Sequence, residues 1–355
     1  MFSITRRLSR NRALKLSSLM STEPVAKRTM AVKIGTHNGK FHCDEVLACF
    51  MLRQLPEYAN AEIVRSRDQT VLDTCDIVVD VGGVYDPSMQ RYDHHQRSFN
   101  YSMNSLCSDF RFVTKLSSAG LIYFHFGRRV LAQVLNVPED NPALPVMFLK
   151  VYENFMEEVD ACDNGINAVD GIPKFHVSTN LGSRVGYLNP SWNEPSQDET
   201  ACFFKAYELV GTEFTSRVNY FYSQWLPARD IVMQAVQNRT KVHESGEIIC
   251  IERFCPWKQH LYEIEKELCL ERTVKFALYC DPKGQWRVQT VSVHADSFEN
   301  RLPLHRDWSA LRDDELCKVS GIPGCIFVHA NLFIGGNVSY DGALQMAVKS
   351  LAARG

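Results

Sequence analysis

The hydrophobic pattern of the first third of the chain predicts strands that alternate with helices. A strand is expected at 32–35, and a helix at 43–55, where apolar residues recur at helical spacing. Two β-branched runs bounded by turn residues, 62–65 and 77–81, predict further strands. Strands separated by helices in this way favour a mostly parallel sheet with helices on its faces.

The middle of the chain is predicted to be mainly helical. Its expected helices span 118–135, 146–162, 198–225 and 227–238. The second of them ends at Asn164-Gly165, a common C-terminal stop. Residues 166–197 are rich in Gly, Pro, Asn and Ser, so we expect a loop-rich connector there.

A second alternating pattern fills the last third of the chain. Strands are predicted at 247–252, 274–280, 286–293 and 325–329. A Gly-Gly turn is expected at 333–337, before a closing helix at 339–352. The predicted fold class is therefore α/β with two lobes, a mostly parallel N-terminal lobe and a smaller C-terminal α/β lobe joined by helices. The expected boundaries are 1–30 for a leader, 31–197 for the first lobe, 198–240 for the helical connector and 241–355 for the second lobe.

Composition narrows the class of protein. The chain has 355 residues, of which 45% are hydrophobic and 23% charged, which is typical of a globular protein of about two domains. The formal net charge of −2 argues against a protein that coats nucleic acid with a basic surface. No stretch approaches the roughly 20 apolar residues of a membrane span, so no membrane association is expected. The 12 cysteines form no C-x-x-C pair, which favours reduced thiols over a metal ribbon.

The first 20 residues differ in composition from the rest. They are rich in Arg and Ser and contain no acid, since the first acidic residue is Glu23. This composition is typical of a mitochondrial transit peptide. A disordered basic tail is the alternative, and in either case we exclude residues 1–30 from the predicted fold.

Potential metal-binding residues occur in four groups. They are His37, His42 and Asp44; Asp80; Asp93, His94 and His95; and Asp160 with Asp163. The first two groups lie at or near predicted strand ends, where open α/β sheets bind ligands, and the fourth ends a predicted helix. We expect all four groups at the same edge of one sheet. Each residue alone is more often a cap, a turn residue or a surface group than a metal ligand. Together, so many carboxylates would repel one another unless divalent cations balanced them. Imidazole and carboxylate ligands without thiolate suit manganese best, with magnesium and zinc as alternatives.

The order of these groups resembles the DHH phosphoesterase superfamily. Longer strings resemble one branch of it, the melanocyte-proliferating-gene exonuclease family. They include I-G-T-H-N-G-K-F-H-C-D-E, V-V-D-V-G-G, R-Y-D-H-H-Q-R-S-F, E-E-V-D-A-C-D-N-G-I, L-N-P-S-W-N and G-I-P-G-C-I-F-V-H-A-N-L-F-I-G-G-N. The similarity runs from Ile34 almost to the C-terminus.

This resemblance implies a metal-dependent exonuclease that shortens single-stranded RNA from its 3′ end, in mitochondria and nucleus. It also implies roles for the individual residues. Asp80 would bridge two metals, His37 and His42 would hold the first, and Asp44, His94 and Asp163 the second, with Asp160 as the competitor of Asp163. His95 would face the scissile phosphate, and Asp93 would orient the histidines, because metal-bound imidazoles usually donate their other N–H to a carboxylate.

The second lobe resembles the substrate-binding domain that accompanies such phosphoesterase domains. Gly335 and Gly336, expected in a turn before a helix, would let backbone N–H groups approach a phosphate. Asn337 stands where the family often has His, and Arg184 is a further candidate for substrate contact. Two rival functions stay open at this point. One is hydrolysis of a small phosphate such as pyrophosphate or a cyclic dinucleotide, and the other is a non-catalytic metal-binding RNA scaffold. The oligomeric state is not predicted.

Overall fold

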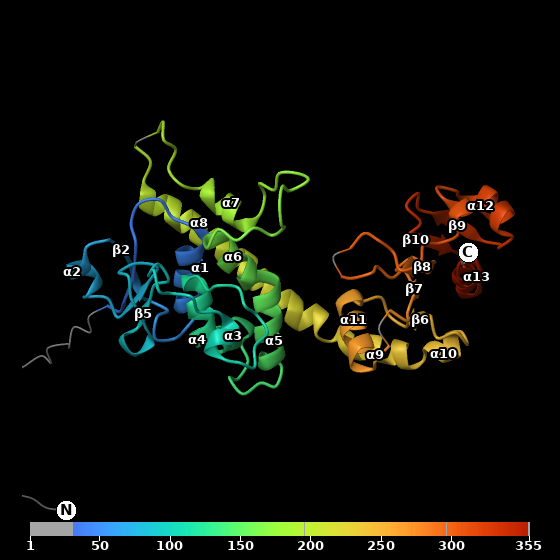
Figure 1. Ribbon diagram of the computed structural model, residues 1–355, viewed down its shortest axis with the longest axis horizontal. Coiled ribbons are helices and arrows are strands. Elements are labelled where there is room, and N and C mark those ends of the chain that lie inside the picture. Colours follow the sequence, from blue (N-terminus) through green and yellow to red (C-terminus); the bar gives the residue numbers. More distant parts are fainter. Residues whose placement is uncertain (1–30, 195, 271, 296, 354–355) are drawn as a thin grey trace, which may run out of the picture. The chain divides into compact units, whose positions relative to one another are not determined.

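The computed structural model is a mixed α/β structure with two five-stranded sheets (Figure 1). It describes residues 31–194, 196–270, 272–295 and 297–353. The predicted leader, residues 1–30, lies outside the described residues. Among the helices that are described, none combines the length and the apolar character needed to cross a bilayer.

The first sheet is mostly parallel, as predicted. Its strands are β1 (Lys33–Thr36), β2 (Glu62–Arg65), β3 (Ile77–Val79), β4 (Tyr85–Asp86) and β5 (Arg91–Tyr92). Their order is β2-β1-β3-β5-β4, and only the β4–β5 pair is antiparallel. The sequence analysis missed the short strands β4 and β5, because two residues carry no readable periodicity.

Helices α1 (Cys43–Arg53) and α4 (Ser118–Leu135) pack against each other over one face of this sheet. Ile34, Ile77 and Val79 point into that core and are fully buried. The opposite face packs against the short helix α2 (Gln69–Leu72) and its neighbours. Successive side chains along a strand point to opposite faces of the sheet, and both faces are covered by helices here.

The predicted helix at 146–162 is confirmed and longer than expected. It consists of α5 (Leu144–Val151), a π-helical segment η2 (Tyr152–Met156) and α6 (Glu157–Asp163). The short helices α3 (Met103–Leu106) and α7 (Leu181–Gly186) were not predicted. Helix α7 lies within the segment that its Gly, Pro and Asn content marked as loop.

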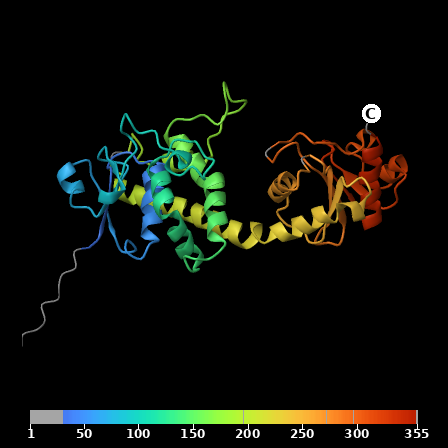
Figure 2. The same cartoon turned by 60° about the horizontal axis from the view of Figure 1, so that its bottom comes forward.

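The chain between the two sheets is helical, as predicted (Figure 2). It contains α8 (Glu199–Tyr220), a second π-helical segment η3 (Phe221–Trp225), α9 (Ala228–Gln237) and α10 (Arg239–Val242). Pro227 stands at the N-cap of α9, where its missing N–H costs no hydrogen bond.

The second sheet is mostly antiparallel. Its strands are β6 (Ile248–Ile251), β7 (Phe276–Cys280), β8 (Trp286–Thr290), β9 (Cys325–Val328) and β10 (Ile334–Asn337), in the order β6-β7-β8-β10-β9. Side chains from one face share a core with α9 and α11 (Lys258–Glu267), and those from the other with α12 (Asp313–Ser320) and α13 (Tyr340–Ala352).

The Gly-Gly turn expected at 333–337 is wrong. Gly335 and Gly336 lie in strand β10, paired with β8 on one side and β9 on the other. A Cβ atom on Gly336 would lie 2.7 Å from Arg287 Nη1 and 3.0 Å from the ring of Phe327. The glycine is therefore explained by two side chains that lie over the strand, rather than by a turn.

Candidate metal centre

The predicted Asp and His groups meet at one edge of the first sheet. His37 follows β1, Asp80 follows β3, and the Asp93-His94-His95 run follows β5. These three strands are parallel neighbours, so their carboxyl ends lie side by side. Asp44, in the first turn of α1, and Asp163, at the end of α6, join them from the helices.

Asp80 lies between the two sides of this cluster. Its Oδ2 is 3.4 Å from His37 Nε2, and its Oδ1 is 3.3 Å from His94 Nε2. Burial by itself would raise the pKa of Asp80, but the two histidines lower it below its usual range. The residue adopts a φ of 59°, a left-handed conformation that few non-glycine residues occupy. Such conformations concentrate at functional sites.

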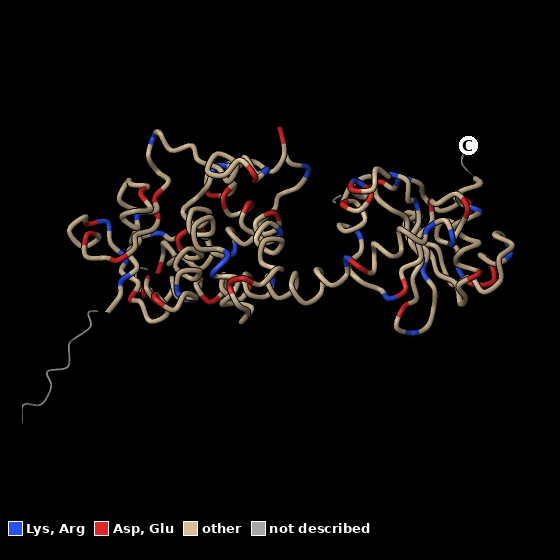
Figure 3. Tube along the Cα trace, turned by 90° about the horizontal axis from the view of Figure 1, so that it is seen from below, with Lys and Arg blue, Asp and Glu red and all other residues tan. Residues whose placement is uncertain are grey.

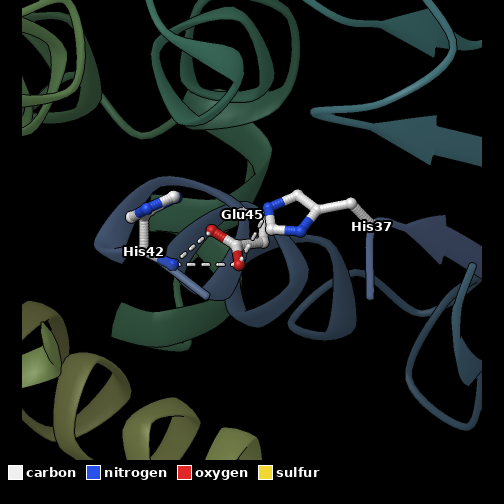
Figure 4. A group of neighbouring side chains, drawn as sticks. All are labelled: His37, His42 and Glu45. Atoms are coloured by element: carbon white, nitrogen blue, oxygen red, sulfur yellow. Dashed lines mark hydrogen bonds and ion pairs between the residues drawn. The ribbon is translucent and has the colours of Figure 1, made fainter. Parts of the chain in front are cut away.

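The first group of candidate ligands is His37, His42 and Glu45, whose ligand atoms lie within 4.8 Å of one another (Figure 4). His37 Nδ1 is 3.1 Å from the carbonyl oxygen of Asn38, which assigns the ring proton to that nitrogen. His37 Nε2 faces Glu45 Oε1 at 3.3 Å and Asp80 Oδ2. Burial acts to lower the pKa of His37, but the contacts with Asp80 and Glu45 raise it above its usual value, so in the metal-free protein Nε2 shares a proton with these carboxylates. A cation bound by this group would replace that proton.

Glu45 is a site residue that the sequence analysis missed. Its carboxylate is fully buried and accepts hydrogen bonds from the His42 backbone N–H at 3.0 Å. Burial and the charge of Asp80 raise the pKa of Glu45 to about 8. The spacing His42-x-x-Glu45 is that of a capping box, and this spacing was the signal available in the sequence.

The second group is Asp44, His94 and Asp163. His94 Nε2 lies 3.0 Å from Asp163 Oδ2 and 3.8 Å from Asp44 Oδ2. Burial opposes a charge on His94, yet Asp163 and Asp80 raise its pKa to about 11. Both of its ring nitrogens are buried without a hydrogen bond of good geometry in the described chain. An imidazole whose Nε2 faces three carboxylates fits a metal ligand, because a cation there would balance their charges.

A third group of candidate ligands is Asp80, His94 and His95, and Asp93 is paired with His95 at its outer edge. Asp93 Oδ1 lies 2.7 Å from His95 Nδ1, and its Oδ2 accepts the N–H of Gly83 at 2.6 Å. Burial acts to raise the pKa of Asp93, but these hydrogen bonds lower it below its usual value. The hydrogen bond between Asp93 and His95 raises the pKa of His95. His95 Nδ1 is also 3.5 Å from Asp80 Oδ1, and the ring is largely exposed.

Asp160 lies outside the three groups of candidate ligands in the described chain. Its carboxylate is fully buried and accepts hydrogen bonds from the Ser117 backbone N–H at 2.9 Å, the Ser117 hydroxyl at 2.8 Å and the Tyr152 hydroxyl at 2.7 Å. Burial raises the pKa of Asp160 to about 7. The Ser117 hydroxyl is also 2.6 Å from Asp44 Oδ1. Asp160 therefore supports the N-terminus of α4 and, through Ser117, the candidate ligand Asp44.

The residues predicted to contact the substrate, Arg184, Gly335, Gly336 and Asn337, are not among the candidate metal ligands of the described chain. Arg184, on α7, forms an ion pair with Glu213 at 2.8 Å. Gly335, Gly336 and Asn337 belong to the second sheet, and Asn337 is fully buried. Its amide donates to the Pro323 carbonyl oxygen at 2.9 Å and its Oδ1 accepts the Ser339 N–H at 3.0 Å, so its visible contacts are structural.

Buried His and Asp groups of this composition can hold a metal ion. They open into a cavity of about 710 Å³, whose walls include His37, Asp80, His95 and Arg67. Charged residues of both signs are distributed along the described chain (Figure 3). The capacity of this cluster to hold a cation therefore depends on its own carboxylates and not on an excess of acidic residues along the chain.

Comparison with known proteins gives a match along almost the whole chain. The family model MYG1_exonuc, described as an uncharacterised protein family (UPF0160), matches residues 33–351. The chain is 55% identical over 324 residues to the protein named MYG1 exonuclease of Mus musculus, covering 91% of this chain and 85% of the relative. It is 51% identical over 349 residues to MYG1 exonuclease of Homo sapiens, covering 98% and 93%. It is 44% identical over 322 residues to the MYG1 protein of Dictyostelium discoideum, covering 90% and 96%.

Proposed function

The chain belongs to the MYG1_exonuc family, and from this premise we propose that it is a metal-dependent exonuclease that removes nucleotides from the 3′ ends of single-stranded RNA. Membership of this family, which the sequence motifs predicted, is confirmed. The proposal includes two divalent cations, with manganese as the best match to imidazole and carboxylate ligands. It also includes action in mitochondria and nucleus, which the basic, acid-poor leader supports in part.

The observation that carries the proposal is the position of Asp80 between two groups of candidate ligands. Its two oxygens approach His37 on one side and His94 on the other, at 3.4 and 3.3 Å. A carboxylate with one oxygen toward each group is suited to two cations rather than one. When bound, two such cations supply Lewis acidity and charge neutralisation for phosphodiester hydrolysis.

The residues of the chain would divide the remaining work. His37, His42 and Glu45 would hold one cation, and Asp44, His94 and Asp163 the other, with Asp80 shared. Asp93 keeps a proton on His95 Nδ1 and so fixes the direction of the exposed ring. His95 Nε2 can then hold a proton toward a phosphate oxygen in the cavity that both residues line.

The test uses the full chain loaded with manganese and single-stranded RNA labelled at its 5′ end. A ladder of products that shortens from the 3′ end is expected, and a 3′-blocked RNA should resist. DNA of the same sequence and pyrophosphate are assayed in parallel. Faster turnover of pyrophosphate would favour a small-phosphate hydrolase, and RNA that is bound but left intact would favour a scaffold. Either result would overturn the proposed function.

A further inference from the structure

A second cavity adjoins the metal centre. It has a volume of about 360 Å³, and its walls include Lys40, His42, Glu158, Asp163 and Leu181. His42 and Asp163 also line the larger cavity described above, so the two cavities meet at candidate metal ligands. The volume lies near the lower end of the range for small-molecule sites, which is about 300–1,000 Å³. The cavity is therefore suited to one small organic group rather than to a length of polymer.

One wall of this cavity is bare backbone of helix α7. Gly182 and Gly186 lie four residues apart, so they share a helix face, and both line the cavity. A Cβ atom on Gly186 would meet nothing within 4 Å, and one on Gly182 would meet only Asn180 Oδ1 at 3.7 Å. Packing therefore does not require either glycine, although each costs about 1 kcal/mol in a helix relative to alanine. Their effect is to leave a flat, open surface.

The end of helix α7, which carries Gly182 and Gly186, is hydrogen-bonded through Asn189 to the loop that carries His42. The Phe41 backbone N–H donates to Asn189 Oδ1 at 2.9 Å, and Asn189 Nδ2 donates to the Phe41 carbonyl oxygen at 2.8 Å. Asn189 lies three residues after the end of α7 and belongs to the L-N-P-S-W-N string singled out in the sequence. These two bonds fix the distance between α7 and the metal centre, so the cavity is part of the built structure of the site.

We propose that this cavity binds the terminal nucleoside of the substrate, with the phosphate attached to that nucleoside at the metal centre. This inference rests on the proposed function and names its substrate unit. A planar base can lie on the Gly182–Gly186 surface beside Leu181, while Lys40 and Glu158 offer partners for phosphate and ribose hydroxyls. The rest of the strand would leave through the larger cavity, where Arg67 can pair with phosphates. A cavity with room for a single nucleoside selects chain ends over internal positions.

The test compares the binding of AMP and of inorganic phosphate to the manganese-loaded protein by titration calorimetry. AMP is expected to bind at least about tenfold more tightly than phosphate, because phosphate occupies only the metal centre. Gly186→Leu fills the cavity from its wall, and a steric conflict of this size weakens AMP binding by about 10- to 200-fold. Its phosphate affinity should stay within about twofold of the wild-type value, since the substitution lies outside the metal ligands. Tyr187→Leu places the same side chain one residue further along, where residue 187 is 74% exposed and outside the cavity, as a matched control.

Three results separate the outcomes. AMP binding no tighter than phosphate binding in the wild-type protein would overturn the inference, and so would an unchanged AMP affinity in Gly186→Leu. Gly182→Leu fills the same cavity from another position and serves as the second variant, with Tm as the check on folding. The wild-type RNA assay reports separately on the proposed function. If RNA is shortened normally but AMP has no preference over phosphate, only the nucleoside site is wrong.

Discussion

Replacing Asp80 by Asn separates the charge of this residue from its size. The amide is nearly isosteric with the carboxylate, but it removes the negative charge that faces both His37 and His94 at 3.4 and 3.3 Å. The side chain is buried, so solvent cannot compensate for the lost charge. Both groups of candidate ligands should lose affinity for cations at once.

The magnitude follows from the burial of the residue. Removing one partner of a buried charge pair costs about 3–5 kcal/mol, which corresponds to roughly 100- to 4,000-fold in affinity at 1.4 kcal/mol per factor of ten. We therefore expect manganese binding to Asp80→Asn to weaken by about this factor, and RNA hydrolysis to fall at least as much. In the metal-free protein the same charge pairs with the histidines, so the free energy of unfolding should also fall, by a similar amount or less.

The assay measures bound manganese by equilibrium dialysis, RNA hydrolysis, and metal-free unfolding in urea. Asp73→Asn, an exposed acid that follows α2, is the matched control and should leave all three unchanged. Asp163→Asn removes a ligand from the second group only and should weaken one manganese ion selectively. Two manganese ions bound to folded Asp80→Asn with near wild-type affinity would refute the bridging role.

Three further predictions concern the surroundings of the cluster. Asp93→Asn should slow RNA hydrolysis by about 10- to 100-fold while both manganese ions stay bound, because Asp93 orients His95; loss of a bound ion would contradict this role. Gly120→Ala should lower the free energy of unfolding in urea by about 1–3 kcal/mol despite the better helix propensity of alanine, because its Cβ would lie 2.6 Å from Asp160 Oδ2; a stabilised variant would show that this packing is wrong. The pKa of His94 is raised to about 11 by its contacts with Asp163 and Asp80. The ion pairs of protonated His94 therefore stabilise the metal-free protein fully below about pH 6.5, and this stabilisation is lost as the pH rises toward 11. A metal ion bound to His94 must displace the same proton. The increase in Tm caused by manganese should therefore be larger near pH 8.5 than near pH 6.5, and an equal increase would contradict the ion pairing.

Much of the first sheet and its site could be predicted because the signals are local. Apolar runs locate β1 and β3, and the residues that follow a parallel strand must lie at the same sheet edge, which brings His37 and Asp80 together. The choice between Asp160 and Asp163 could not be made in this way. They are three residues apart on one helix, and only the packing of α4 decides that Asp160 meets Ser117 while Asp163 meets His94.

Side chains distant in sequence explain the error at Gly335-Gly336. Paired glycines usually indicate a turn, because glycine tolerates many backbone conformations. Here the strand needs glycine because Arg287 and Phe327 lie across its surface. These two residues belong to other strands, so the sequence next to the glycines does not indicate the contacts. The helix α7 was missed for a related reason, since its glycines and the surrounding Pro and Asn residues have low helix propensity.

The π-helical segment η2 has a consequence for how the length of this helix can change. A π turn accommodates one extra residue, and each residue of a helix advances the face by about 100°. The segment thus sets the rotational phase of Asp163 independently of the apolar residues of α5 that anchor the same helix in the core. Because the π turn already takes up one residue more than an α turn, deleting a single residue from Tyr152–Met156 would restore a regular helix and keep Asp163 directed toward His94. The same deletion within α6 has no such turn to absorb it, and it would rotate Asp163 by about 100° away from His94.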